Sequence, residues 1–390
     1  MTLELAAQLA LGALLVSSVL FDVFQTVVVP RWTSRRWRIA PFLIAELWAV
    51  WRPSVYKIRS QRRQDDWLGA FAPLSVILIL IVWVAQLTVG YGFAVHALSD
   101  QIRPHPTSWT GAFYIAGTSL LTIGYGDFVP DTSLARMIFL SAGAAGLATF
   151  ALVISWLFTL YQAFAHREIM VLTLDGRAGA PPSGVTMLET YGALKMTNQL
   201  HFTFERWELW TAEVLDSHLA YPVLPFFRSS HDNESWIGAM GAVLDAATLV
   251  ITTVESGPDN ERVGHGAAQM MYRLGCHAVA DLSIYFRYRL PAKTRKKQKH
   301  MNWLPHPGVE LREFRLARRQ LEKAGYKLKS EAESWHDFSE KRAVYAFDLN
   351  NLAKLFAAVP SPWIGDRTTL PYLQPHPHEA QEIHEDTKAM

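Results

Sequence analysis

The sequence predicts an all-α membrane protein in which each chain contributes three transmembrane helices, one re-entrant pore loop and a helical cytoplasmic domain. Three observations support this fold class. Three apolar stretches in the first 165 residues are long enough to cross a bilayer, which needs about 20 residues of helix. A shorter apolar segment ends at a glycine-rich loop. The remaining residues have the polarity of a soluble domain, with apolar side chains recurring at helical spacing.

The apolar stretches define the order of the membrane elements. They cover residues 5–29, 68–95 and 134–164, and the shorter segment covers residues 107–121. The second and third stretches predict an outer and an inner helix around a pore helix and its loop, within a pore domain of residues 67–165. The first stretch predicts a separate, peripheral transmembrane helix in residues 1–30.

The charges between the first two stretches predict the orientation of the chain. Glu4 precedes the first stretch and no basic residue does, which argues against a secretory signal peptide. Residues 31–66 carry the basic side chains Arg31, Arg35, Arg36, Arg38, Arg52, Lys57, Arg59, Arg62 and Arg63. Loops rich in lysine and arginine stay on the cytoplasmic side. We therefore expect a multi-pass protein of the cell membrane, with its N-terminus outside and residues 31–66 as a cytoplasmic or interfacial linker.

Residues 39–52 of this linker predict an amphipathic helix. Trp48 and Trp51 alternate with apolar side chains, and Pro53 is expected to end the helix. One interpretation places this helix along the cytoplasmic membrane interface. The alternative is a short soluble helix that packs on the domain below.

Asp22 is a carboxylate inside the first apolar stretch. An acidic side chain at this depth is expected to pair with a nearby arginine or to reach toward the interface. Membership in a proton relay is the alternative.

The loop after the shorter segment has the sequence Thr122-Ile123-Gly124-Tyr125-Gly126-Asp127. A potassium ion sheds its water where rings of backbone carbonyl oxygens replace the hydration shell. Carbonyls of successive residues point the same way only when the backbone adopts dihedral angles that a Cβ disfavours, and glycine permits these angles. The hexapeptide resembles the selectivity filter of potassium channels.

The resemblance implies roles for the residues of the loop and for the assembly. The ion-binding positions would be Thr122, Ile123, Gly124, Tyr125 and Gly126, with potassium ions as the bound species and no other cofactor. Asp127 and Thr118 would support the loop from behind. Because each chain has one such loop and the filter is a four-fold ring, a homotetramer is implied. The departures from the family, Leu121 in place of a second threonine and Thr118 and Ile115 behind the loop, leave a poorly selective cation channel as an alternative.

The resemblance extends to the segment before the loop. Trp109, Phe113 and Tyr114 are similar to the aromatic start of a pore helix in this family. Thr107 or Ser108 is expected to cap that helix.

The inner helix contains Gly143 and Gly146 among several alanines. Gly146 lies at the distance from the loop where the family places its gating hinge. Either these small residues let helices pack closely, or glycine weakens the helix so that its cytoplasmic half can swing. Phe150, Ile154 and Phe158 recur at helical spacing and are candidates for a hydrophobic gate that closes by dewetting.

Residues 166–360 predict a helical cytoplasmic domain. Apolar residues recur at helical spacing in 187–219, 236–256, 260–289, 307–324 and 331–359. Residues 175–185, rich in glycine and proline, predict a linker or a small hairpin, and residues 361–390 predict a disordered tail. The glycine pattern of nucleotide-binding domains is not evident, so the sequence does not indicate which ligand this domain would bind.

Three polar groups in this domain are candidate sites. His277 and Asp281 lie four residues apart, with His265 earlier, and this spacing can bind a divalent metal. A hydrogen-bonded pair in the core is the favoured interpretation. For the His231-Asp232 dipeptide, a loop or helix cap is favoured over a metal-dependent phosphohydrolase site. Asp245, in an apolar run, predicts a core polar group with its hydrogen bonds satisfied.

A basic run opens the last part of the domain. Its members are Lys293, Arg295, Lys296, Lys297 and Lys299, followed by Arg312, Arg315, Arg318 and Arg319. Beneath a membrane, anionic lipid headgroups are the nearest partner for such a cluster, and a solvated surface is the alternative. Nucleic acid is not expected.

Together these features predict a channel for passive potassium permeation and not an enzyme. The inner helix would carry the gate, and the cytoplasmic domain would assemble the tetramer or bias that gate. From other classes, a non-selective cation channel and a membrane-anchored enzyme or sensor with a vestigial pore remain alternatives.

Overall fold

The computed structural model describes residues 3–29, 39–229, 231, 233–256, 263–289 and 307–364, with the backbone alone at 287–289. Contacts divide the chain into two compact units. The first unit contains described residues up to 48, residues 70–162 and residues 220–223, and the second contains the others. Several predicted features lie outside the described residues: Arg31, Arg35, Arg36, Arg38, Asp232, the basic run of residues 293–299 and the tail from residue 365.

The predicted all-α membrane fold is confirmed. The first unit is built from α1 (Leu3–Val23) with its π-helical end η1 (Phe24–Val28), the start of α2 (Ile39–Val55), most of α3 (Gln61–Ala97), α4 (Trp109–Leu120) and the first part of α5 (Ser133–Ala178). A short 3-10 turn, η2 (Ser99–Gln101), follows α3. The described strands are β1 (Ile102–Arg103) and β2 (Val129–Pro130), an antiparallel pair that joins Ile102 to Pro130.

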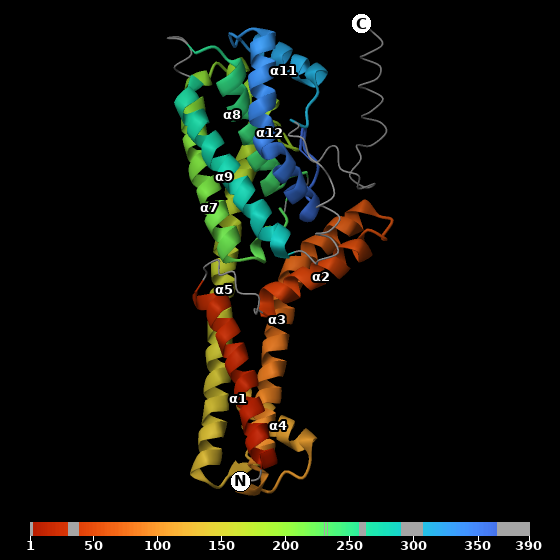
Figure 1. Cartoon of the computed structure of the whole chain (residues 1–390), viewed down its shortest axis with the longest axis vertical. Coiled ribbons are helices and arrows are strands. Elements are labelled where there is room, and N and C mark those ends of the chain that lie inside the picture. The colour runs from red at the N-terminus through yellow and green to blue at the C-terminus, as the bar shows by residue number, and fades with distance from the viewer. Residues whose placement is uncertain are drawn as a thin grey trace. The chain divides into compact units, whose positions relative to one another are not determined.

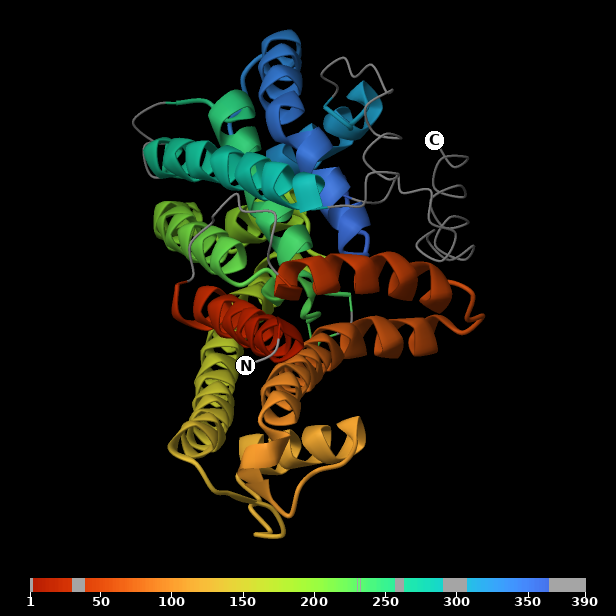
Figure 2. The same cartoon turned by 60° about the horizontal axis from the view of Figure 1, so that its bottom comes forward.

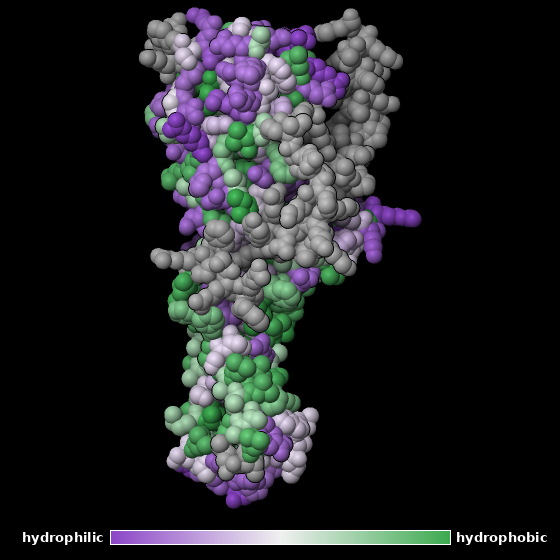
Figure 3. Space-filling model, in the orientation of Figure 1, coloured by the Kyte–Doolittle hydropathy of each residue, from purple (hydrophilic) through white to green (hydrophobic). Residues whose placement is uncertain are grey.

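Four described helices are long and apolar enough to cross a membrane: Leu3–Val28, Gln61–Ala97, Ser133–Ala178 and Trp236–Thr253. The first three are the predicted spans. Hydrophobic side chains cover the surface around α1 in Figure 3, whereas the surface near α11 is hydrophilic. The fourth helix differs because 94% of its apolar window is buried inside the protein, so a protein core accounts for its composition.

Close contacts join α1 to α3. A Cβ on Gly12 would lie 2.6 Å from the carbonyl oxygen of Gly90, so the two backbones approach at a position that only glycine allows. Polar pairs lie on either side of this crossing: Gln8 with His96 at 3.0 Å, Ser18 with Gln86 at 2.8 Å, and Asp22 with Trp83 at 2.9 Å. Figures 1 and 2 show the two helices side by side. The peripheral helix is therefore packed onto the outer helix along its length.

Asp22 connects three helices. Its side chain is 3% exposed and accepts hydrogen bonds from the Trp83 indole and from the backbone N–H groups of Ile39 and Ala40. A carboxylate is favourable at this place because the first N–H groups of a helix have no intrahelical acceptor. Asp22 thus binds the N-terminus of α2. The arginines with which it was expected to pair lie outside the described residues.

The expectation that Pro53 ends the amphipathic helix was wrong, because α2 continues to Val55. A proline within a helix removes one hydrogen bond. The last turn is held by other contacts: Val55 is buried, and Arg52 donates to the hydroxyl of Tyr56, four residues on, at 3.1 Å.

The inner helix α5 is longer than predicted. It runs to Ala178, through the start of the segment predicted as a linker or hairpin. Met170, Val171 and Leu174 are buried, so packing extends the helix beyond its apolar stretch. It ends at Gly179, whose φ of +78° is the left-handed conformation common just after a helix.

The second unit is a helical bundle. Its elements are α6 (Gly184–Ala193), η3 (Thr197–Gln199), α7 (Leu200–Ala220), η4 (Leu224–Phe226), α8 (Trp236–Thr253), α9 (His265–Arg289), α11 (Leu311–Lys323) and α12 (Glu331–Leu355). Helix α8 packs against α6, α9 and α12, and Figures 1 and 2 show α9 and α12 beside it. The helices α8, α9, α11 and α12 lie within the segments in which the apolar spacing predicted them. The predicted segment 187–219 instead divides into α6, which begins at Gly184 within the predicted linker, and α7.

Asp245, on α8, lies in the core with its hydrogen bonds satisfied, as predicted. It receives hydrogen bonds from Arg342 at 2.8 and 3.2 Å and from the hydroxyl of Tyr345 at 2.6 Å. Arg342 is fully buried and also donates to the carbonyl of Trp363. A buried ion pair needs such complete hydrogen bonding to offset its desolvation, so this network fixes α12 against α8.

Candidate functional site

The sequence offers two residues, Thr107 and Ser108, as the cap of the helix before the loop. Ser108, and not Thr107, caps α4, because its hydroxyl accepts the N–H of Gly111 at 3.2 Å. The helix buries Ala112 and Ala116 against the rest of the first unit. Its last residues therefore have a fixed position from which the loop starts.

The end of α4 binds the N–H groups of the loop. Thr122 donates to the carbonyl of Ser119 at 3.1 Å. Ile123 and Gly124 both donate to the carbonyl of Thr118, at 2.9 and 3.4 Å. Thr118 thus contacts the loop through its backbone, since its hydroxyl donates to Ile115 within the helix. The N–H groups of residues 122–124 therefore all donate to carbonyls at the end of α4.

The sign of φ alternates along the loop. Thr122, Gly124 and Gly126 have φ values of 55°, 57° and 78°, whereas Ile123 and Tyr125 are outside the left-handed region. Alternating right-handed and left-handed residues turn successive N–H groups toward one side. In a planar trans peptide the carbonyl lies opposite the N–H, so the carbonyls turn toward the other side.

The carbonyl side of the loop is open within the chain. Among the described residues, none donates a hydrogen bond to the carbonyl oxygens of residues 122–126. An added Cβ on Gly124 or Gly126 would meet no atom within 4 Å. Tyr125 is 70% exposed. Several oxygens on one strand of backbone are therefore available to a ligand that prefers oxygen.

One side-chain hydrogen bond connects α4 to the end of the loop. The hydroxyl of Tyr114 donates to Asp127 at 2.9 Å, and its ring contacts Phe128 edge-on. The sequence had placed Asp127 as a support without naming Tyr114 as its partner. The sequence did contain a signal for this pair, since a tyrosine in the helix precedes an acidic residue at the end of the loop.

The segments around the loop hold its C-terminal end. Asp131 donates its N–H to the carbonyl of Gln101 and accepts from Arg103 at 3.0 Å, so the exit of the loop is bound to η2 and β1. At the start of α4, Trp109 stacks on His96 with the ring centroids 3.7 Å apart.

Gly146 of the inner helix contacts the end of α4. A Cβ added to Gly146 would overlap the carbonyl of Leu120, whereas one on Gly143 would lie at an ordinary 3.5 Å from Ser119. Close packing against the end of α4 thus explains why glycine occupies position 146. The helix α5 has no break at this position, and the hinge interpretation stays a prediction.

The candidate gate residues lie on an unburied face of α5. Ile154 is 55% exposed and Phe158 66% exposed, and Phe150 is half-buried. By contrast Trp156 and Leu160, on the other face, are buried within the chain. Apolar side chains on the unburied face are available to line a pore or to contact another copy.

The weak metal candidates are not brought together. His277 and Asp281 form an exposed pair at 3.5 Å on α9, and not the expected core pair. His265 contacts the carbonyl of Val254 at 3.2 Å. Twelve residues of helix separate it from His277, which is about 18 Å at the usual rise. In the described part of the chain, no three acidic, histidine or cysteine side chains form a metal-binding group.

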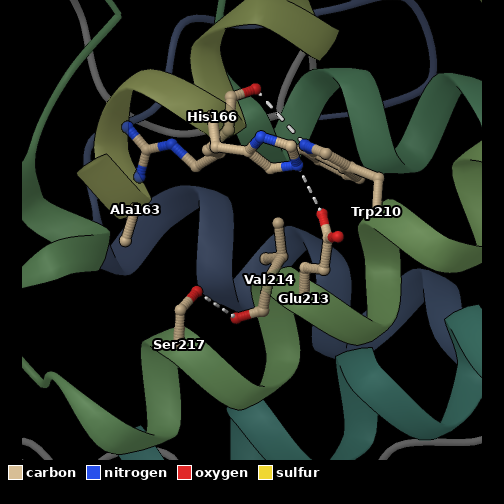
Figure 4. Close-up of a pocket in the computed structure, with 7 residues that line it drawn as sticks. Ala163, His166, Trp210, Glu213, Val214 and Ser217 are labelled. Atoms are coloured by element: carbon tan, nitrogen blue, oxygen red, sulfur yellow. Dashed lines mark hydrogen bonds and ion pairs between the residues drawn. The ribbon is translucent and has the colours of Figure 1, made fainter. Parts of the chain in front are cut away.

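A pocket lies between the end of α5 and α7. Figure 4 shows Ala163, His166, Trp210 and Val214 around it, with a hydrogen bond of 2.9 Å between His166 and Glu213 at its rim. The lining of the pocket combines apolar side chains with His166, Arg167, Glu213 and Ser217, and nothing in it indicates a ligand.

Arg167, which also lines this pocket, is buried against His218. Its guanidinium contacts Glu168 at 2.9 Å and Nε2 of His218 at 3.3 Å. Burial, and then the positive charge of Arg167, holds the pKa of His218 well below its usual value. The imidazole is therefore neutral at physiological pH.

Residues 78–163 match the family model described as Ion channel. This range contains the second half of α3, α4, the loop 122–127 and α5 as far as residue 163. That part of the chain is therefore similar to ion-channel domains. A curated relative, the uncharacterized membrane protein YdjJ of Bacillus subtilis (strain 168), is 25% identical over 190 residues, 47% of this chain and 54% of the relative. The match thus spans about half the length of that relative. No solved structure matches.

Proposed function

We propose that the ion-channel domain of residues 78–163 forms, in a ring of four chains, a pore selective for potassium. One observation supports this most directly: φ alternates in sign from Thr122 to Gly126, while the end of α4 binds the N–H groups behind. This arrangement leaves a row of carbonyls free on the opposite side. Four such rows around an axis would replace the hydration shell of a potassium ion.

In this mechanism the chain supplies oxygens and rigidity, and no covalent step occurs. Ions would shed water at the carbonyls of Thr122, Ile123, Gly124 and Tyr125. Gly126 and Asp127 would hold the outer mouth, with Asp127 fixed by Tyr114 at 2.9 Å. Partial negative charge at the end of α4 would favour a cation below the loop.

A homotetramer is part of the same proposal. One loop per chain cannot surround an ion, so the ring needs copies of this chain. The exposed Ile154 and Phe158 and the open side of Gly124 are consistent with a surface covered by other copies. The gate would lie at Phe150, Ile154 and Phe158 on α5, and the second unit would bias it.

Anionic lipid headgroups are the proposed further partner. Lys57 and Arg59 are exposed in the turn between α2 and α3, and Arg62 and Arg63 are exposed in the first turn of α3. Phe42 and Val50 on α2 are also exposed, at 65% and 68%. Exposed basic and apolar groups in one short helical hairpin suit the cytoplasmic interface of a cell membrane.

A non-selective cation channel is the second candidate. The hydroxyl of Thr118 is used within α4, and Leu121 has no side-chain donor. In the described residues, the side-chain support of the loop is the Tyr114–Asp127 bond. A filter with so few braces would discriminate less by size between potassium and sodium.

The proposal is tested by cation flux into liposomes that contain the purified full chain. We expect flux with a reversal potential near that of potassium, and its loss in Gly124→Ala, because alanine is strained at a φ of +57°. The matched control is Gly266→Ala on α9, where a Cβ meets no atom within 4 Å and φ is not left-handed. Flux that is absent, or unchanged in Gly124→Ala, would contradict a channel. A reversal potential near zero in opposed potassium and sodium gradients would select the non-selective candidate.

A further inference from the structure

The five residues from Leu224 to Arg228, between α7 and α8, are termed here the junction segment. On one side the segment is bound to the inner helix. Arg167 of α5 donates to the carbonyl of Leu224 at 3.2 Å and to that of Phe227 at 2.6 Å. The rings of Phe164 and Phe227 lie 5.5 Å apart. The extension of α5 and the junction segment thus share both polar and aromatic contacts.

The other end of the junction segment is bound to the outer helix. Arg228 forms an ion pair of 3.1 Å with Asp65, in the first turns of α3. Its second terminal nitrogen, Nη1, donates to the carbonyl of Ala357, just after α12, at 2.6 Å. One arginine therefore holds the base of α3 and the end of α12 together.

The middle of the segment is fixed to the bundle core. Trp236, at the start of α8, donates its indole N–H to the carbonyl of Pro225 at 3.3 Å. Phe226 packs edge-on against Phe356 with the ring centroids 5.0 Å apart. Leu224 is fully buried. The segment is therefore an ordered part of the bundle.

The contact with α5 is costly to break. Arg167 has a side chain only 2% exposed, and its charge is balanced by Glu168. A buried guanidinium that loses its acceptors retains its desolvation cost. If α5 moves at this level, we expect the junction segment to move with it.

We infer that the junction segment is the link through which the helical bundle sets the spacing of α3 and α5 at their cytoplasmic ends, and so biases the gate. The inference rests on the proposed channel function. It follows from two facts: the segment binds both helices, and each helix continues unbroken into an apolar span, α3 from Gln61 to Ala97 and α5 from Ser133 to Ala178. A gate on α5 opens only if α5 moves, so any opening must either carry the segment along or strain the Arg228–Asp65 pair.

Single-channel recording of the full chain in planar bilayers tests this inference. The variants are Asp65→Asn, Arg228→Gln and their combination, with Asp66→Asn as the matched control, because it removes the neighbouring exposed charge. Both single variants should shift the open probability in the same direction by at least about threefold, since a partly exposed pair is lost in each of four chains. The double variant should shift it no further than the larger single effect. Conductance and reversal potential should not change.

Three outcomes would overturn the inference. One is an unchanged open probability in all three variants of a conducting channel. Another is an equal effect of Asp66→Asn, which would assign the shift to surface charge. The third is a change in conductance without a change in open probability. Absence of current in the wild-type chain would contradict the proposed function itself and is distinct from these. Size-exclusion profiles matching the wild type would show that each variant assembles.

Discussion

At the scale of single residues, the left-handed backbone of Thr122 is the least expected feature of the loop. Glycines 124 and 126 could be assigned positive φ from the sequence, since glycine adopts it freely. A β-branched threonine at a φ of 55° is disfavoured by about 1–2 kcal/mol. Its N–H bond to Ser119 and the bonds of the next two residues to Thr118 hold it there. Contacts with the surrounding backbone keep a residue in such a strained conformation. These contacts cannot be recognised from the sequence pattern.

Gly146 and Gly143 give a paired test of close packing. Gly146→Ala should destabilise the chain by about 1–3 kcal/mol, because its Cβ would overlap the carbonyl of Leu120 and shift the end of α4. Gly143→Ala, with 3.5 Å of space, should be tolerated. Thermal unfolding in detergent measures the difference, and flux should fall with Gly146→Ala alone. Equal stability of the two variants would contradict the packing role of Gly146 and favour the hinge interpretation.

His218 should make stability depend on pH. Because burial lowers its pKa, the folded state resists protonation that the unfolded state accepts. Above the unfolded pKa of about 6.5, the imidazole is neutral in both the folded and the unfolded state, so it does not change the free energy of unfolding. As the pH falls below that value, this histidine should reduce the unfolding free energy by up to about 1.4 kcal/mol per pH unit. His218→Gln should flatten the curve between pH 7.5 and pH 5, measured by denaturant titration.

The control for this measurement is His336→Gln, at an exposed position on α12. It should leave the slope unchanged. A slope that persists in His218→Gln would assign the acid sensitivity to another group.

At the scale of helices, the sequence predicted existence and order well, and boundaries less well. The spans, the pore helix and the bundle helices followed from hydrophobic periodicity. The misses have one cause: contacts distant in the chain override local signals. Pro53 does not end α2 because Val55 is buried, and α5 extends to Ala178 because Met170 and Leu174 pack in the second unit. The Tyr114–Asp127 pair was missed for the same reason.

The first helix should be held to the pore domain by Asp22. Within the described part of the chain, Asp22→Ala removes the acceptor of the Ile39, Ala40 and Trp83 N–H groups, and the last two are buried, at about 1–3 kcal/mol for each buried group. We expect a marked loss of thermal stability and protease cleavage near α2. Asp22→Asn should lose less, because its amide oxygen still accepts. Glu46→Ala, at an exposed site on α2, is the control and should behave as the wild type.

At the scale of the whole molecule, the proposed pore exists only between chains. No single chain places oxygens around an ion, so the functional unit must follow from how many loops share one axis. Mixing wild-type and Gly124→Ala chains in equal amounts measures that number. If one altered loop in four is enough to stop permeation, random assembly leaves only about one sixteenth of the pores intact, and flux should fall to that level. Flux near one half would mean that each chain conducts alone, and about one quarter would mean a dimer. A curve of flux against the altered fraction, with Gly266→Ala mixtures staying flat, separates these cases without any assumption about the gate.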